Sequence, residues 1–319
     1  MRTEREHHTE HRLVVAAPPR VLYGLVADVT AWPAVFGPSV HVRHLDRSER
    51  EERFELWATV NGAVSTWTSR RTLDPGGLRV TFDREVSAPP IASMGGEWRF
   101  RALPGNRCEV VLLHRFTTTD DDPGTVGWVT AALDRNSPEE LAALARVAQS
   151  GHPVEDVVFS FTDARALSGS AAGAYEFVAR ADLWAERLPH VSRAVLSEPA
   201  PGVQDLELDT VTADGSRHTT RSVRVCGEGE WIAYKQVVTP ELLHGHSGLW
   251  TFTEGPEGAL VTSRHTVVIN PGAVGTVLGA GKTVADAKVF VRNALGRNSA
   301  TTMSSAAAFA AEHSARSGF

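Results

Sequence analysis

Short runs of alternating polar and apolar residues make up much of the first half of the chain. The runs RFELWATV, STWTSRRTL, LRVTFDREV, GGEWRFRAL and CEVVLLHRF show the period of two that is typical of β-strands. An earlier β run, HRLVVAA, is separated from them by a stretch with Val21, Leu22, Leu25 and Val26 at helical spacing. A long helical stretch, TVGWVTAALDRNSPEELAALARVAQ, ends the series. The pattern therefore predicts a strand, a helix, a run of antiparallel strands and a closing helix that covers the concave face of the sheet.

The same series of elements occurs twice. The hexapeptide ALDRNS at 132–137 returns as ALGRNS at 294–299, and the turn Asn61-Gly62 has a counterpart in Asp214-Gly215. Further matches, 151 to 153 residues apart, are Tyr23 with Tyr175, Trp32 with Trp184, Ser69-x-Arg71 with Ser222-x-Arg224, Trp98-x-Phe100 with Trp250-x-Phe252, and His114 with His265. The spacing changes where loops are expected and stays constant inside the elements, so the chain contains two copies of one fold.

Two tandem domains of the α+β class follow from this repeat, covering residues 1–150 and 151–319. The segment SGHPVE at 150–155 has the composition of a linker between them. A domain of about 150 residues is long enough to bury a core without a metal or disulfide bonds.

Composition narrows the range of partners and compartments. The net charge of −6 argues against nucleic acid as the main partner, because phosphate binding needs a basic surface. No apolar run approaches the length of a membrane span, and the first residues, MRTEREHHTEH, do not resemble a signal peptide. Two cysteines, Cys108 and Cys226, are too few for a disulfide framework. We therefore expect a soluble protein of the cytoplasm.

One strand of each copy carries a serine and an arginine on the same face. Because residues two apart in a strand share a face, Ser69 and Arg71 lie beside Trp67, as Ser222 and Arg224 lie beside Cys226. The apolar or small neighbours favour the concave face, where arginine would place a permanent cation in a cavity. The alternative is a solvent-exposed face with a solvated arginine. Recurrence of Ser-x-Arg in both copies favours the interior.

Other polar residues are candidates for proton transfer. His114 and His265 come near the ends of equivalent strands, and a histidine in a cavity can move a proton at neutral pH; the alternative is a structural histidine. On the closing helices, Asp134 is a candidate acid/base group, and Asn136 and Asn298 are predicted to reach the cavity. Alternatively, the Arg-Asn-Ser motif caps or bends the helix. The second copy has glycine in place of Asp134, so the two sites are not expected to be equivalent.

No motif indicates a cofactor or a metal. GTVLGAGKT at 275–283 resembles a phosphate-binding loop, but five residues separate Gly275 from Gly281 where the motif needs four. His244-Gly245-His246 lacks a third ligand at usable spacing, and neither cysteine belongs to a CxxC pair. We therefore predict no cofactor and no metal ion.

The segments DVTAWPAVF, WTSRR, GGEWRF and LDRNS resemble bacterial type II polyketide aromatase/cyclases, and the doubled unit resembles their di-domain subclass. The resemblance implies a helix-grip (START-like) fold, in which a curved antiparallel sheet wraps a long C-terminal helix over a deep pocket. It also implies a poly-β-ketone substrate held on an acyl carrier protein, in contact with a minimal polyketide synthase. The enzyme would fold this chain, close the first ring between carbons 7 and 12 by aldol addition, and remove water to make the ring aromatic.

The resemblance also assigns residues. The pocket serine and arginine of the family match Ser69 and Arg71 and, through the repeat, Ser222 and Arg224. Single-domain relatives often have a tyrosine shortly after the WP-x-x-F segment, near which this chain has Ser39. The expected aromatic walls of the two pockets are Trp32, Phe36, Trp67, Trp98, Trp184, Tyr234 and Trp250.

In such a pocket, arginine would stabilise the developing enolate or alkoxide, and histidine or aspartate would transfer protons. For carrier docking, the candidate basic residues are Arg43, Arg47, Arg50, Arg99 and Arg101, unless these arginines pair with nearby glutamates. Two rival interpretations are a non-catalytic carrier of hydrophobic ligands, and one catalytic domain beside a scaffold domain.

Overall fold

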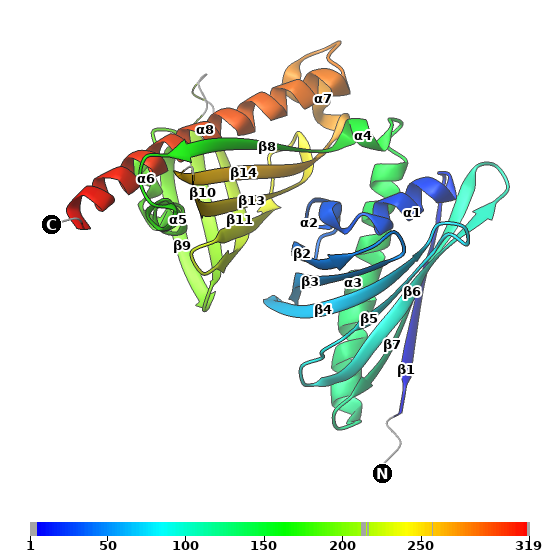
Figure 1. Cartoon of the computed structure of the whole chain (residues 1–319). Helices are drawn as coiled ribbons and strands as arrows, with labels where there is room; N and C mark the ends of the chain where they lie inside the picture. Colours follow the sequence, from blue (N-terminus) through cyan, green and yellow to red (C-terminus); the bar gives the residue numbers. More distant parts are fainter. Residues whose placement is uncertain (1–4, 212–214, 216, 257, 318–319) are drawn as a thin grey trace. The chain divides into compact units, whose positions relative to one another are not determined.

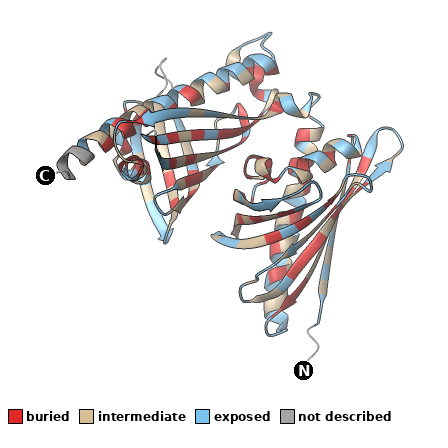
Figure 2. Cartoon of the chain, in the orientation of Figure 1, coloured by how far each residue is buried: buried red, intermediate tan, exposed pale blue. Residues whose placement is uncertain are grey.

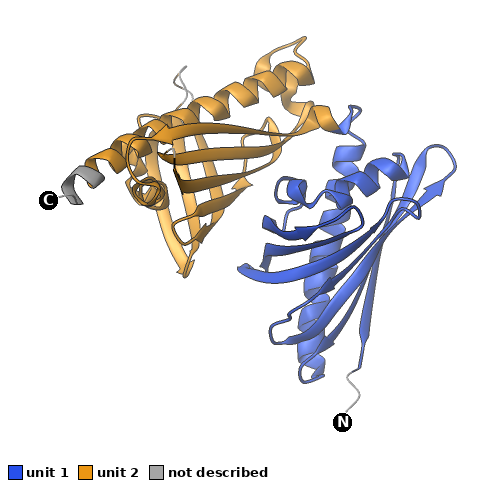
Figure 3. Ribbon diagram, in the orientation of Figure 1, with its two compact units in different colours: residues 1–154 blue, residues 155–319 orange. Residues whose placement is uncertain are grey.

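The computed structural model describes residues 5–211, 215, 217–256 and 258–317. The chain folds as two compact units, residues 1–154 (unit 1) and 155–319 (unit 2), shown in Figure 3. Of the predicted turn Asp214-Gly215, Asp214 lies outside the described residues, whereas Gly215 has a positive φ of 83°.

Unit 1 begins with a strand and a short helical segment and ends with a long helix (Figure 1). Its elements are β1 (His7–Val15), α1 (Pro19–Ala27), the 3-10 helix η1 (Val29–Ala31), α2 (Trp32–Val35), β2 (Ser39–Arg47), β3 (Glu51–Val60), β4 (Ala63–Asp74), β5 (Arg79–Arg84), β6 (Ile91–Leu103), β7 (Arg107–Thr118) and α3 (Pro123–Ala148). The strands form one antiparallel sheet in the order β1-β7-β6-β5-β4-β3-β2. This is the predicted order of elements.

Unit 2 repeats this order. The short helix α4 (Val154–Val157) spans the division between the units and has no counterpart in unit 1. The elements that follow it are β8 (Val158–Leu167), α5 (Ala171–Ala179), η2 (Ala181–Leu183), α6 (Trp184–Arg187), β9 (Val191–Ala200), β10 (Val203–Val211), β11 (Arg217–Gly227), β12 (Trp231–Val238), β13 (Leu243–Gly255), β14 (Gly258–Ile269), η3 (Pro271–Ala273), α7 (Val274–Leu278) and α8 (Val284–Ser317). The sheet order β8-β14-β13-β12-β11-β10-β9 matches that of unit 1 strand for strand.

Alternating side chains and tight turns explain the sheets. Strand β3 alternates buried and less buried residues along its length, and Figure 2 shows the same alternation along other strands. Asn61 and Gly62 both have positive φ, which the two-residue β3–β4 turn requires. Asp122 caps the start of helix α3, and its side chain accepts hydrogen bonds from the amides of Gly124 and Thr125.

The extra residues of unit 2 lie between β14 and α8. They form η3, α7 and a loop in which Gly279 and Gly281 have positive φ. The GTVLGAGKT segment is therefore part of an insertion that unit 1 does not have. Among the described residues, no helix combines the length and the apolar character that crossing a membrane requires.

Candidate functional site

Unit 1 contains a cavity between the concave face of its sheet and helix α3. The cavity has about 1030 Å³ of empty space, part of which is open to solvent. The predicted site residues that line it are Trp32, Phe36, Trp67, Ser69, Arg71, Trp98, His114 and Asn136. Ser39, which stands near the family's tyrosine position, lines it as well. The structure therefore brings together residues from α2, β4, β6, β7 and α3.

Aromatic rings form much of the wall. The ring of Phe36 stacks on Trp98 with centroids 6.3 Å apart, and it meets Trp32 edge to face at 5.3 Å. Trp128 of α3 also lines the cavity while 45% exposed, so it lies where the cavity opens. A rigid aromatic wall restricts how an extended, flexible ligand can fold inside the cavity.

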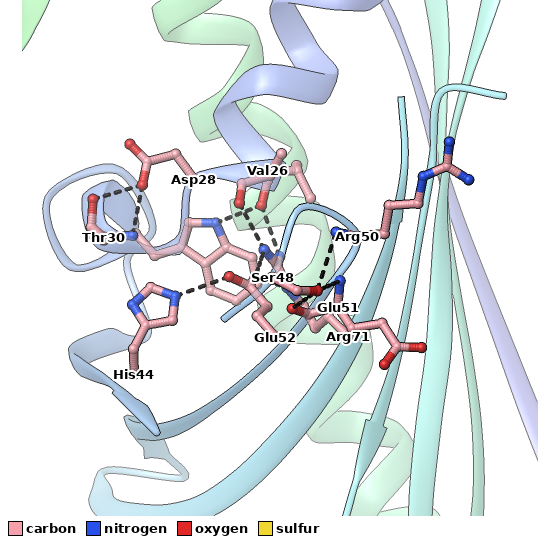
Figure 4. A network of polar contacts seen from close by, with 11 residues as sticks. Val26, Asp28, Thr30, His44, Ser48, Arg50, Glu51, Glu52 and Arg71 are labelled. Carbon is pink, nitrogen blue, oxygen red and sulfur yellow. Dashed lines mark hydrogen bonds and ion pairs between the residues drawn. The ribbon is translucent and has the colours of Figure 1, made fainter. Parts of the chain in front are cut away.

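Arg71 lies on this wall, but its hydrogen bonds go to the protein (Figure 4). Its Nε donates to Glu52 Oε1 at 2.8 Å, and its Nη2 donates to the same carboxylate oxygen. Its Nη1 donates to Val26 O and its Nη2 to Ala27 O, both at 2.8 Å. The guanidinium is also 4.9 Å from the ring centroid of Trp32.

Four of the five N–H groups of Arg71 are therefore occupied. The side chain is 1% exposed and joins β4 to the last turn of α1, whose carbonyls would otherwise lack partners. Glu52 is equally buried, and its second oxygen lies 2.9 Å from His44 Nε2. The placement of Arg71 at the cavity follows the prediction, but the expected role of enolate-stabilising donor does not fit this geometry.

Arg84, which the sequence interpretation passed over, is the available cation. It lies on β5, lines the cavity and stacks its guanidinium 3.8 Å from the ring centroid of Trp67. No hydrogen bond or ion pair of this guanidinium occurs among the described residues. Burial lowers the pKa of Arg84 to about 10, so it stays protonated at neutral pH. Its counterpart in unit 2 is Gln236, so a search for repeated residues does not find it.

Two more titratable groups line the cavity in neutral form. Burial, assisted by the charges of His11 and Arg84, lowers the pKa of His114 to about 3. Its Nδ1 is buried without a partner among the described residues. Burial raises the pKa of Glu140 to about 8, with Glu139 adding to the shift, so Glu140 is mostly a protonated acid at pH 7.

Helical spacing explains which side chains of α3 reach the cavity. Asn136 and Glu140 are one turn apart and both line it. Asp134 is on the other side of the helix, 58% exposed, with its Oδ1 3.0 Å from His11 Nε2. The assignment of Asp134 as an acid/base group in the pocket is therefore wrong, and Glu140 is the carboxyl group that α3 supplies. The sequence signal that could have identified Glu140 is its position four residues after Asn136, on the same face of the helix.

In unit 2, the inward arginine lacks a carboxylate partner within the described structure. Arg224 is 2% exposed and donates from Nη2 to Val178 O at 2.7 Å, while its Nη1 has no partner among the described residues. Gln204 stands at the position of Glu52, paired with Arg224 in the β10–β11 register, and its Nε2 donates to Ala179 O at 3.3 Å. Burial lowers the pKa of Arg224. Ser222 is also buried, as predicted.

The other predicted site residues of unit 2 lie in three kinds of environment: the hydrophobic core, a network of polar contacts, and the surface. Trp184 and Trp250 belong to the hydrophobic core. Tyr234 and His265 form a polar network, with Tyr234 Oη 3.1 Å from His265 Nδ1. Asn298 is exposed, so the prediction that it reaches a cavity is wrong. The next residue, Ser299, faces the sheet instead, with Oγ 2.7 Å from His265 Nε2.

The five candidate docking arginines do not form one patch. Arg43 is on β2, and Arg99 and Arg101 are on β6, at a distance of several strands in the sheet. These three arginines form ion pairs with Glu55, Glu97 and Glu109 respectively. Arg47 and Arg50, at the β2–β3 turn, form no ion pair within the described part of the chain.

Comparisons with known proteins agree with this architecture. The crystal structure of the di-domain ARO/CYC BexL from the BE-7585A biosynthetic pathway aligns with a TM-score of 0.80 and 46% identity, covering 95% of this chain and 98% of that one. The di-domain ARO/CYC StfQ from the steffimycin pathway aligns with a TM-score of 0.80 and 37% identity, covering 98% and 100%. The predicted fold, two tandem helix-grip domains, is confirmed. The chain thus has the fold of a di-domain aromatase/cyclase.

Curated relatives give the family. The family model described as polyketide cyclase/dehydrase and lipid transport matches residues 15–131. The granaticin polyketide synthase bifunctional cyclase/dehydratase of Streptomyces violaceoruber is 56% identical over 302 residues, covering 94% of this chain and 93% of that protein. The actinorhodin counterpart of Streptomyces coelicolor is 51% identical over 316 residues, covering 96% and 97%. The chain belongs to the bifunctional cyclase/dehydratases of type II polyketide synthases. It is an enzyme rather than a passive carrier.

Proposed function

We propose that the cavity of unit 1 folds a poly-β-ketone delivered by an acyl carrier protein and closes its first ring between carbons 7 and 12. The observation that carries this proposal is one cavity that combines aromatic walls, the cation of Arg84 and the neutral acid of Glu140. The reaction takes place in the cytoplasm with the minimal polyketide synthase. The two free cysteines are consistent with a reducing compartment.

The three features match the steps of an aldol addition. The methylene between two carbonyls gives a proton to water at the open end of the cavity, and Arg84 stabilises the negative charge of the resulting enolate. The enolate carbon attacks a distant carbonyl, and Glu140 gives a proton to the oxygen that becomes the hydroxyl. Glu140 then regains a proton from the protonated water, so no net proton is gained or lost. The aromatic walls hold the two carbons close, which lowers the entropy cost of ring closure. His114, kept neutral by burial, offers its Nδ1, which has no partner among the described residues, to the substrate as a hydrogen-bonding group without adding charge.

Reconstitution with a minimal polyketide synthase, with and without its ketoreductase, tests the proposal. Arg84→Gln introduces the residue that unit 2 has at this position and should lower the rate of first-ring closure by about 10²–10³-fold. Spontaneous, incorrectly folded shunt products should then dominate. The matched control is Arg115→Gln, because Arg115 is 43% exposed and pairs with Asp83 outside the cavity.

The result against the proposal is a wild-type product profile from a folded Arg84→Gln variant. Product structure reports the carbon pair that closes, so a ring closed elsewhere rejects the carbon 7 to carbon 12 assignment. The last arm of the experiment compares the double variant Arg47→Glu/Arg50→Glu with the wild type on two substrates, the carrier-bound polyketone and a carrier-free analogue. If the carrier docks at the β2–β3 turn, the double variant should slow only the carrier-bound substrate.

A further inference from the structure

Unit 2 has polar residues where the cavity of unit 1 has apolar walls. The strand registers are equivalent, since Phe82 pairs with Gly96 in unit 1 as Tyr234 pairs with Gly248 in unit 2. By the same registers and the repeat, the cavity residues Phe82, Met94 and Leu112 correspond to Tyr234, His246 and Ser263. Three apolar positions of one site have therefore become hydrogen-bonding positions.

These residues form one chain of hydrogen bonds with the residues that replace Arg84, His114 and Ser137. Gln236 Oε1 lies 3.0 Å from His246 Nδ1, and His246 Nε2 lies 3.0 Å from His265 Nδ1. On the other side of the ring, His265 Nε2 lies 2.7 Å from Ser299 Oγ of α8. The chain thus runs from β12 through β13 and β14 to the closing helix.

The chain has a defined direction. A carbonyl oxygen only accepts, so His246 Nδ1–H donates to Gln236 Oε1. Burial lowers the pKa of His246 and lowers that of His265 to about 4, so both rings are neutral at pH 7. His246 therefore has a bare Nε2, which lies 3.0 Å from His265 Nδ1 and 3.4 Å from Tyr234 Oη. The shorter contact assigns the proton of His265 to Nδ1, which leaves its Nε2 bare to accept from the hydroxyl of Ser299.

Packing of the closing helix does not require this chain. Unit 1 places α3 over its sheet with Met94 and Leu112 at the equivalent positions, and Ser137 there is just as buried as Ser299. The hydrogen-bond chain also lies near a cation, Arg224. Arg224, whose Nη1 has no partner among the described residues, is the direct β11–β12 neighbour of Tyr234. A bare imidazole nitrogen and a spare guanidinium N–H on one concave face can serve the two ends of a β-hydroxyketone.

We propose that unit 2 is a second, chemically distinct site that removes water from the closed ring, with His265 as its proton-transfer group and His246 and Gln236 as positioning residues. This proposal rests on the proposed function, because its substrate is the β-hydroxyketone that aldol closure produces. It also argues against unit 2 as a scaffold.

The step needs no other reactant. Ser263 Oγ lies 3.2 Å from both Ser299 Oγ and His265 Nε2 and donates to Ser299. Reversal of this hydrogen bond, so that Ser299 donates to Ser263, turns the Ser299 hydroxyl away and frees His265 Nε2. His265 Nε2 then takes the proton from the carbon next to the carbonyl, while Arg224 stabilises the enolate oxygen. The electron pair of the broken C–H bond forms the C=C bond, the C–O bond of the hydroxyl breaks, and the same proton passes from His265 to the leaving oxygen. Water is released and the imidazole is neutral again.

The test uses the full-length enzyme and a small set of variants. His246→Met places the unit 1 residue in unit 2 and removes the group that fixes the ring of His265. Gln236→Leu removes the acceptor at the end of the chain, whereas Gln236→Glu keeps it. Thr251→Val is the matched control, because it removes a 2.6 Å hydroxyl contact with Thr262 on the same strand pair but outside the chain.

His246→Met should leave the closed ring with its hydroxyl group retained, with water elimination slowed by about 10²-fold. Gln236→Leu should do the same to a smaller extent, and Gln236→Glu should restore elimination. Nitrogen-15 NMR of the imidazoles should show the Nδ1–H form of both histidines in the wild type and loss of that preference at His265 in His246→Met.

Aromatised product at the wild-type rate from folded His246→Met overturns the proposal, as does an Nε2–H form of His265 in the wild type. Loss of ring closure together with elimination in this variant also overturns it, since the chain would then not be specific to water removal. If the wild-type enzyme itself does not change the products of the synthase, the proposed function fails instead, and the two failures are distinguishable.

Discussion

Units 1 and 2 have the same sheet order and each ends with a long helix, but their inward arginines have different hydrogen-bond partners. In unit 1, Arg71 is neutralised by Glu52, which also contacts His44. In unit 2, Gln204 takes the place of Glu52, and Arg224 keeps a buried N–H without a partner in the described part of the chain. The arginine that recurs in the sequence therefore has different partners in the two units.

A repeated fold can thus place different polar groups at equivalent positions. Unit 1 uses Arg71 to hold α1 against the sheet and leaves Arg84 stacked on a tryptophan in an apolar cavity. Unit 2 has glutamine at the position of Arg84, and a chain of neutral polar groups begins there. Removal of equivalent residues in the two units should therefore give unequal effects.

The largest expected effect is on stability. Arg71→Ala leaves the buried carboxylate of Glu52 without its cation, which should lower the free energy of unfolding by about 3–5 kcal/mol. Arg224→Ala strands no carboxylate of this kind, because Gln204 is neutral, and should cost clearly less. Differential scanning calorimetry of both variants measures the contrast. Equal losses of unfolding free energy would mean that the two arginines have equivalent partners. Gln204→Glu supplies a carboxylate to unit 2, so in that background Arg224→Ala should cost more and the difference from Arg71→Ala should become smaller.

The second effect concerns Glu140 and pH. Its pKa is about 8 in the folded chain against 4.5 as the ordinary value, so the folded state keeps a proton that the unfolded state releases between these values. Stability should therefore fall as pH rises from 4.5 to 8. Glu140→Gln should be more stable than wild type at pH 8 and similar at pH 4.5, as measured by urea unfolding.

The same substitution should also act on catalysis. A glutamine side chain is neutral at every pH and has no acidic proton to give, so Glu140→Gln should lower the rate of ring closure by about 10²-fold or more. The wild type should lose activity above pH 8 as Glu140 ionises, and the variant should not show this loss. An unchanged pH–rate profile in the variant would remove Glu140 from the mechanism.

The smallest effect should come from Asp134. Its one polar contact within the described residues is with His11, and its carboxylate is 58% exposed, so Asp134→Ala should change the free energy of unfolding by no more than about 1 kcal/mol. Product formation should match the wild type. A large loss of activity would show that the outer side of α3 takes part in the reaction, and that the two units differ at this helix for a catalytic reason.

The doubled fold, the order of the elements and the inward face of the β4 and β11 strands can all be predicted from the amino-acid pattern. Period-2 and helical patterns specify which face of an element is buried, because a side chain's direction depends on its place in the strand or helix. For this reason Trp67, Ser69 and Arg71 are correctly predicted on the cavity side. The match of the second copy to the first likewise locates the buried Ser222 and Arg224.

Which polar groups are neutralised and which remain available depends on the assembled tertiary structure. Arg71 and Glu52 meet through the β3–β4 register, while Arg84 reaches the cavity with no hydrogen-bond acceptor among the described residues. Glu140 keeps its proton because burial disfavours its charged form, and that burial depends on packing from several elements. Desolvation and hydrogen-bond satisfaction are properties of the whole neighbourhood, so residues with equal patterns in the sequence acquire different charges and different roles.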